Sequence, residues 1–131
     1  MLTRRQCLMV PLLLPSLAGA TAELQRAMQR ARAMRAAAVR AGDQPFGAVV
    51  LRGAQILGEA PSRVITANDP TAHAEREALR DAMRRSGSAD LSGCVLVSTS
   101  RPCRLCETAA AQARIARMVH GDALTDAGPP A

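Results

Sequence analysis

Two pairs of residues able to bind a metal, each at an expected helix start, constrain the fold of this chain more than any other feature. His73 and Glu75 follow residues 69–71 (DPT), where an aspartate cap and a proline in the first turn are typical of a helix start. Cys103 and Cys106 also follow a proline, and their spacing points both sulfur atoms the same way from one helical turn. If two parallel βα units are neighbours, both helix starts lie at the same edge of the sheet and the two pairs converge.

The apolar pattern around these pairs predicts one α/β domain, residues 21–121, with the element order αββαβαβ. An Ala-rich helix ends before Gly42, and two short apolar runs joined through Gly53 form a β-hairpin. A β-rich run before the cysteine pair is typical of an interior strand. The expected helices cover residues 22–41, 69–86 and 103–113, and the expected strands cover residues 46–51, 55–58, 94–99 and 115–121.

Both ends of the chain are expected to lie outside this domain. Residues 1–20 are similar to a twin-arginine export signal, because Arg4 and Arg5 precede an apolar run and the small residues 18–20 follow it. The alternative is a wrongly assigned start or an unstructured apolar tail, and the apolar run is too short for a stable membrane span. The expected location is the periplasm or the exterior, or the cytoplasm if the signal is not functional. Residues 122–131 are predicted to form a flexible tail.

The basic charge of the chain does not by itself indicate a nucleic-acid site. All 17 basic residues are arginines, against 11 acidic residues, and the net charge is +6. The arginines are spread along the expected helices as on solvated faces, and net charge alone favours only non-specific attraction. The chain has one Phe and no Trp or Tyr, so aromatic stacking on nucleobases is scarce.

The cysteine pair alone leaves two interpretations open. A Cys-x-x-Cys sequence in an exported protein is more often a disulfide or redox pair than a metal site. His73 favours a metal, because one neutral imidazole and two thiolates cancel the charge of Zn²⁺ and leave a fourth tetrahedral position for water, as in a catalytic zinc site. Residues two apart on a helix diverge by about 200°, so His73 and Glu75 share a site only where the helix begins. A carboxylate at Glu75 is then placed to remove a proton from that water.

Five segments resemble, in order, the cytidine and deoxycytidylate deaminase superfamily: residues 43–50, 68–75, 78–80, 102–106 and 113–117. The second segment (NDPTAHAE) is similar to bacterial guanine deaminases and tRNA adenosine deaminases. The resemblance implies a three-layer α/β/α fold with a mixed sheet, and a homodimer. For the site it implies Zn²⁺ bound by His73, Cys103 and Cys106, Glu75 as the catalytic proton carrier, and substrate contacts from Phe46, Ser62 and Ala74.

The activity that this resemblance implies is hydrolytic deamination of a nucleobase or nucleoside, with release of ammonia. Guanine is favoured, and cytosine and adenosine are alternatives. Export would separate the chain from tRNA, so a free base or nucleoside is the expected partner. Three other interpretations stay open: conversion of adenosine to inosine in tRNA, a zinc-binding pseudoenzyme of the same fold, and a thiol–disulfide protein.

Three departures from the family pattern bear on the substrate. Ser62 stands where related sequences have an asparagine, and Arg101 replaces an acidic residue before the Pro-Cys sequence. The sequence also ends shortly after the last expected strand, where relatives continue with further helix, so the pocket is either open or completed by a partner chain. Cys94 and His120 are expected to be a buried strand residue and a strand-end residue, both outside the site.

Overall fold

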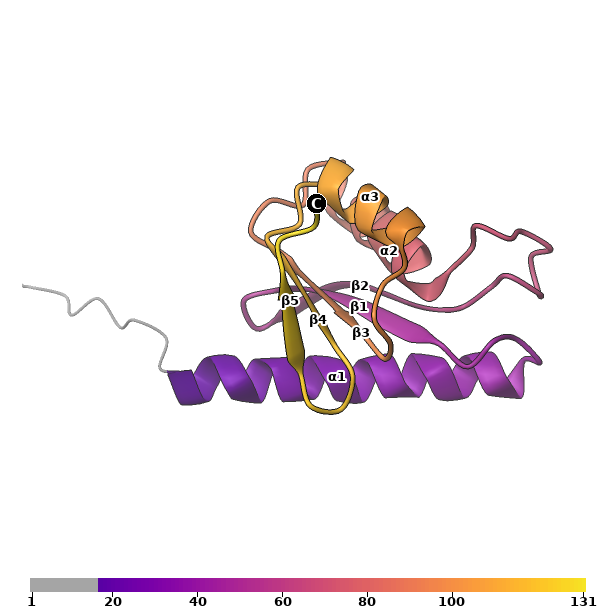
Figure 1. The fold of residues 1–131 in the computed structure, drawn as a ribbon, viewed down its shortest axis with the longest axis horizontal. Coiled ribbons are helices and arrows are strands. Elements are labelled where there is room, and N and C mark those ends of the chain that lie inside the picture. Colours follow the sequence, from indigo (N-terminus) through magenta and orange to yellow (C-terminus); the bar gives the residue numbers. More distant parts are fainter. Residues whose placement is uncertain (1–16) are drawn as a thin grey trace, which may run out of the picture.

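A five-stranded mixed sheet is the middle layer of the computed structural model, which describes residues 17–131 (Figure 1). The strands are β1 (Gly47–Arg52), β2 (Gln55–Pro61), β3 (Val95–Ser98), β4 (Arg117–His120) and β5 (Thr125–Gly128). Their order in the sheet is β2-β1-β3-β4-β5. Strand β1 runs antiparallel to β2 and β3, β3 and β4 are parallel, and β5 is antiparallel to β4.

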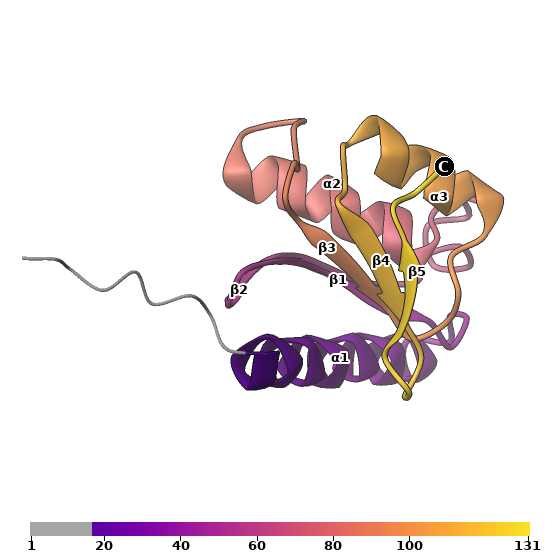
Figure 2. The same cartoon turned by 60° about the vertical axis from the view of Figure 1, so that its left-hand side comes forward.

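Helices cover both faces of this sheet: α1 (Leu17–Arg40), α2 (Ala74–Ser86) and α3 (Arg104–Gln112). Helix α1 lies along one face, and α2 and α3 lie on the other (Figures 1 and 2). Successive strand residues point to opposite faces, so Ala48, Val50 and Leu96 join the core under α2 and α3, while Val49, Leu51 and Val97 join the core under α1. The expected three-layer α/β/α fold with a mixed sheet is confirmed.

Close contact between the helices and the sheet depends on two glycines. A Cβ atom at Gly47 would lie 2.1 Å from the Ala31 carbonyl oxygen of α1. At Gly58 it would lie 2.4 Å from the Ala82 amide nitrogen of α2. Both separations are shorter than van der Waals contact to backbone atoms, so any larger residue would displace a helix from the sheet. These two positions therefore set how closely the outer layers approach the strands.

Helix α2 begins later than residues 69–71, where the sequence pattern places its start. His73 is the N-cap, and Ala74 is the first helical residue. Asp69 instead closes a separate turn, because its carboxylate accepts hydrogen bonds from the Thr71 amide at 2.8 Å and the Thr71 hydroxyl at 2.7 Å. An aspartate uses the same kind of bond to cap a helix and to close a turn, so the sequence does not separate the two cases.

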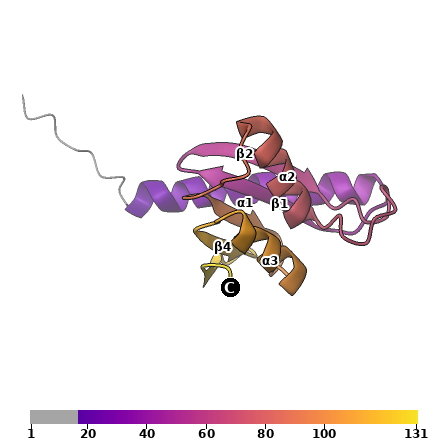
Figure 3. The same cartoon turned by 90° about the horizontal axis from the view of Figure 1, so that it is seen from above.

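The expected pair of neighbouring parallel βα units is also corrected, because β1 lies between β2 and β3. The two helix starts nevertheless converge. Strands β2 and β3 point in the same direction, since each is antiparallel to β1. Helix α2 follows β2, α3 follows β3, and both pack on the same face of the sheet, as the view from above shows (Figure 3).

Residues 122–131 are not the flexible tail that the sequence predicts, because they contain β5 and extend the element order to αββαβαββ. Residues Thr125–Gly128 pair with β4, and the Arg117 guanidinium forms an ion pair of 2.9 Å with Asp126. The strand is exposed along most of its length, so no apolar alternation marks it in the sequence.

Most of the expected export signal, residues 1–16, lies outside the described residues. Its last four residues, 17–20, form the beginning of α1. Within residues 17–131, no helix has both the length and the apolar character needed to cross a membrane.

Candidate metal centre and active site

The N-terminal ends of α2 and α3 bring three metal-binding side chains together. His73 and Cys103 are the N-cap residues of the two helices, and Cys106 lies in the first turn of α3. The His73 Nδ1 atom lies 3.5 Å from Cys103 Sγ and 3.4 Å from Cys106 Sγ, and the two sulfur atoms are 3.7 Å apart. These three atoms form a nearly equilateral triangle, as ligands around one ion do.

The size of this triangle fits zinc. Tetrahedral zinc with bonds of about 2.3 Å to sulfur and about 2.0–2.1 Å to nitrogen places two sulfur ligands about 3.8 Å apart and a sulfur and a nitrogen ligand about 3.6 Å apart. The separations of 3.4 to 3.7 Å in this chain agree with those edges. Two thiols and one imidazole also match the soft donors that zinc prefers. The residues present therefore fit a zinc ion with a fourth position left open.

The protonation of Cys106 depends on whether a cation is bound. Its side chain is fully buried. Burial raises the pKa of the Cys106 thiol, and the nearby Glu75 carboxylate raises it further. Without a cation this thiol would stay protonated, whereas a bound dication and the positive ends of α2 and α3 favour the thiolate. The cluster therefore gains a ligand when a metal binds.

The Glu75 carboxylate lies directly behind the ligand triangle. It is only 5% exposed, and its Oε2 atom lies 3.6 Å from Cys106 Sγ. Its Oε1 atom accepts a hydrogen bond of 2.6 Å from the hydroxyl of Ser98, the buried last residue of β3. One oxygen is thus held by the sheet, and the other lies beside a candidate metal ligand.

A cavity of about 160 Å³ opens beside this cluster. It is smaller than the sites of drug-sized ligands, which range from about 300 to 1,000 Å³, and its size suits a single heterocyclic ring system. Its lining residues are Gln44, Phe46, His73, Ala74, Glu75, Ser100, Arg101 and Cys103.

Comparison with a known family agrees with this geometry. The family model for the cytidine and deoxycytidylate deaminase zinc-binding region matches residues 21–122. The chain belongs to this deaminase family. The zinc that the family binds is the ion that the triangle of His73, Cys103 and Cys106 fits.

Individual relatives of this deaminase-family chain differ in name and in length. The chain is 42% identical over 106 residues to tRNA(Ile)-lysidine synthase of Deinococcus deserti. The aligned residues make up 80% of the chain and 20% of that protein. It is 40% identical over 83 residues to guanine deaminase of Bacillus subtilis (63% of the chain, 53% of the enzyme). It is 37% identical over 78 residues to tRNA-specific adenosine deaminase of Aquifex aeolicus (60% of the chain, 52% of the enzyme). The chain thus matches about half the length of these two deaminases and a fifth of the synthase.

The solved structure of the Bacillus subtilis guanine deaminase has the same fold. It superposes on the chain with a TM-score of 0.70 at 36% identity, over 74% of the chain and 62% of that structure. The family and fold that the sequence motifs indicate are therefore confirmed.

The structure brings most of the sequence-predicted site residues of this deaminase-family chain to one place. The three ligand candidates form the triangle, Glu75 lies behind it, and Phe46 and Ala74 line the cavity. His120 is the last residue of β4, as expected. Cys94 is buried, as expected, but it lies directly before β3 and not within the strand.

Ser62 is the exception, because it does not line the cavity. Its side chain is 1% exposed, and its hydroxyl donates a hydrogen bond of 2.9 Å to Asp43. Burial disfavours ionisation of Asp43, but hydrogen bonds from the Thr66 and Gln44 amides and the Ser62 hydroxyl outweigh it and lower the Asp43 pKa to about 2. Ser62 therefore belongs to a buried network that holds the loop after β2, and a direct substrate contact is not supported.

Sequence reasoning missed two residues that shape the site, Asp43 and Ser98. Asp43 follows Gly42 between two regular elements, a position where aspartate often bonds to nearby backbone amides. Ser98 ends an apolar strand shortly before the Pro-Cys sequence, and a buried polar residue there needs a partner. Both signals were present in the sequence, but neither identifies the partner.

Proposed function

We propose that this chain is a zinc-dependent hydrolytic deaminase of a nucleobase or nucleoside, with His73, Cys103 and Cys106 as ligands and Glu75 as the proton carrier. One observation supports this most strongly. A ligand triangle with edges of 3.4 to 3.7 Å lies beside a buried carboxylate and opens into a cavity the size of one ring system.

The residues divide the chemistry between them. Zinc, when bound, is the Lewis acid that activates water for attack on the ring carbon carrying the exocyclic amine. One imidazole and two thiolates neutralise the dication, so the metal needs help in removing the proton from water. Glu75 accepts this proton and passes it to the ring nitrogen. It then transfers the second proton of the added water, from the new hydroxyl on the ring carbon, to the departing amine. The reaction replaces the carbon–nitrogen bond with a carbon–oxygen bond, consumes one water and releases one ammonia.

Ser98 positions the proton carrier in this proposal. We expect Ser98→Ala to lower kcat by about tenfold to a hundredfold, because a hydrogen bond to a charged group contributes about 1.5–3 kcal/mol. KM and zinc content should change little, since Ser98 contacts neither the cavity nor the ligand triangle. Steady-state kinetics and elemental analysis of the same preparations test this. A raised KM with unchanged kcat would assign Ser98 a purely structural role.

Guanine is the ring that we favour as substrate. The segment of residues 68–75 resembles guanine deaminases, and the Bacillus subtilis enzyme of that name is 40% identical to this chain. The second candidate is adenosine in tRNA, which the similarity to the Aquifex aeolicus enzyme supports. A zinc-binding pseudoenzyme is the third.

Ammonia release distinguishes these candidates. We expect the zinc-loaded chain to release ammonia from a guanine-containing compound faster than from cytosine, adenine or their nucleosides, or from a tRNA anticodon stem-loop. Release from the stem-loop alone would favour the tRNA activity. One zinc per chain with no ammonia from any substrate would support the pseudoenzyme.

Assembly and location remain predictions from the sequence. A homodimer is the assembly we propose, and it would provide a second chain to cover a cavity that is open at its mouth. Export through residues 1–20 would place the folded, zinc-loaded protein where a thiol needs the metal as protection against oxidation.

A further inference from the structure

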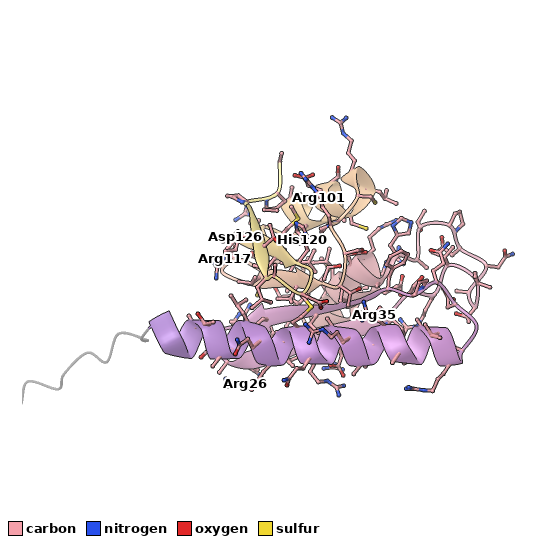
Figure 4. All side chains as sticks on the ribbon, turned by 60° about the horizontal axis from the view of Figure 1, so that its bottom comes forward. Arg26, Arg35, Arg101, Arg117, His120 and Asp126 are labelled. Carbon is pink, nitrogen blue, oxygen red and sulfur yellow. The ribbon has the colours of Figure 1, made fainter. Side chains whose placement is uncertain are left out.

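Arg101 is a charged residue that lines the cavity beside the ligand triangle. It lines the cavity together with Glu75. Its side chain is exposed, and Figure 4 labels it among the side chains of the molecule. Ion pairs hold many arginines elsewhere, including Arg30 with Glu59 and Arg117 with Asp126. Among residues 17–131, no hydrogen bond or ion pair holds the Arg101 guanidinium. A cation without a described partner therefore lines the cavity.

A second hollow, of about 480 Å³, also has Arg101 in its lining. Arg101 lines both spaces, and Arg104, Glu107 and Thr108 line the second. The Arg104 guanidinium also has no partner among the described residues. Glu107, the acidic residue of this lining, accepts a hydrogen bond of 3.0 Å from the Ala131 amide. Two guanidinium groups and one side-chain carboxylate thus line the second hollow, and neither guanidinium is ion-paired with that carboxylate in the described residues.

These positions suit a substrate that has a ring and an anionic group attached to that ring. A ring that reaches the ligand triangle fills the small cavity, so any group attached to the ring must extend beyond it, and Arg101 lines both this cavity and the second hollow. Glu75 is the acidic residue of the cavity lining, and it is already held by Ser98. A guanidinium matches the geometry of a phosphate, which it binds with two parallel hydrogen bonds. An anionic group of the substrate is therefore the best partner for the Arg101 guanidinium.

We propose that Arg101, with Arg104 beside it, binds a phosphate group of the substrate, so that the chain selects phosphorylated nucleosides over free bases and nucleosides. This inference rests on the deaminase function proposed above. It differs from the free base that export would favour, because it follows from the charge at the mouth of the cavity. Arg101 is a specificity residue in this proposal and takes no part in moving protons.

Equilibrium binding tests the proposal without turnover. Zinc-loaded Glu75→Ala protein is titrated with guanosine and with guanosine 5′-monophosphate, and the same pairs are measured for cytidine and adenosine. We expect the monophosphate of the preferred nucleoside to bind about tenfold more tightly, as one charge-assisted hydrogen-bonded contact at an exposed position provides. This ratio should fall towards one in about 1 M salt, because exposed charges are screened.

Charge reversal identifies the residue responsible. Arg101→Glu, and Arg101→Gln as a milder change, should abolish the preference for the monophosphate. Arg52→Glu is the matched control, because Arg52 is exposed at the opposite end of β1 from the cavity and lines none of the described hollows. It should keep the wild-type ratio. Zinc content and thermal unfolding of each variant confirm that the folds are intact.

A short oligonucleotide distinguishes two sources of the phosphate. Tighter binding of the monophosphate alone assigns the site to a terminal phosphate, and equally tight binding of the oligonucleotide assigns it to a phosphodiester. Equal affinity of wild-type protein for nucleoside and monophosphate would overturn the proposal, as would a preference that survives in Arg101→Glu. Ammonia release without any phosphate preference refutes this inference and leaves the deaminase function standing. Phosphate preference without ammonia release refutes only the function.

Discussion

Replacing Glu75 with alanine is expected to lower kcat by about 10²- to 10⁴-fold while zinc content stays at one ion per chain. General acid–base groups contribute rate factors of this order. The effect is large here because the ligand set neutralises the metal charge, so no other group in the cavity lining can take the proton from water. The measurement is ammonia release under saturating substrate, combined with elemental analysis and a thermal unfolding curve.

Two further variants isolate the role of the carboxylate. Glu75→Gln keeps a carbonyl oxygen that can accept the Ser98 hydrogen bond, so its fold is expected to stay intact while its activity is lost. Glu77→Ala removes a carboxylate two residues along the same helix, which pairs with Arg63 and Arg80 away from the cluster. That variant should retain most of its activity, because ion pairs near the surface contribute little. Near-wild-type deamination by Glu75→Gln would show that the assigned role is wrong.

The sequence predicts the layers of this fold better than their connections. A continuous apolar run marks β1 and the strand before the cysteine pair, because these strands are buried between two layers of helices. Strand β5 carries no such pattern, since backbone pairing with β4 and the ion pair of Asp126 hold an exposed segment. The position of β1 between β2 and β3 depends on long-range pairing, which local pattern does not encode.

The candidate site shows the same division. The ligand types and their spacing at two helix starts predict the triangle, because metal chemistry restricts which residues can take part. The hydrogen-bond partners within the site could not be predicted from the sequence. Nothing in the sequence links Ser98 to Glu75 or Ser62 to Asp43, because each pair comes from distant segments that only the folded chain brings together. The family pattern assigned Ser62 to the substrate, whereas the structure buries it beside Asp43.

Replacing either cysteine of the triangle with serine is expected to remove zinc and to destabilise the folded chain together. Cys103 and Cys106 are the proposed ligands at the N-terminal end of α3, and His73 is the proposed ligand at the N-terminal end of α2, so a bound ion would join two helices that pack against each other. Zinc present at about 1,000 times its Kd stabilises a folded protein by about 4 kcal/mol, and this contribution disappears with the ligand. Chelation of zinc from the wild-type protein should lower its unfolding temperature by about as much as either cysteine substitution does.

Cys94 provides the matched control for this last prediction. It is as buried as Cys106, yet it lies outside the triangle, before β3. Cys94→Ala is expected to lose some packing energy and to keep one zinc per chain, whereas Cys103→Ser and Cys106→Ser should lose the metal. The same preparations also test the thiol–disulfide alternative, because a redox pair would carry no zinc and would form a disulfide under mild oxidation. A wild-type chain that is fully stable without zinc, and unchanged in stability by Cys106→Ser, would contradict the metal centre.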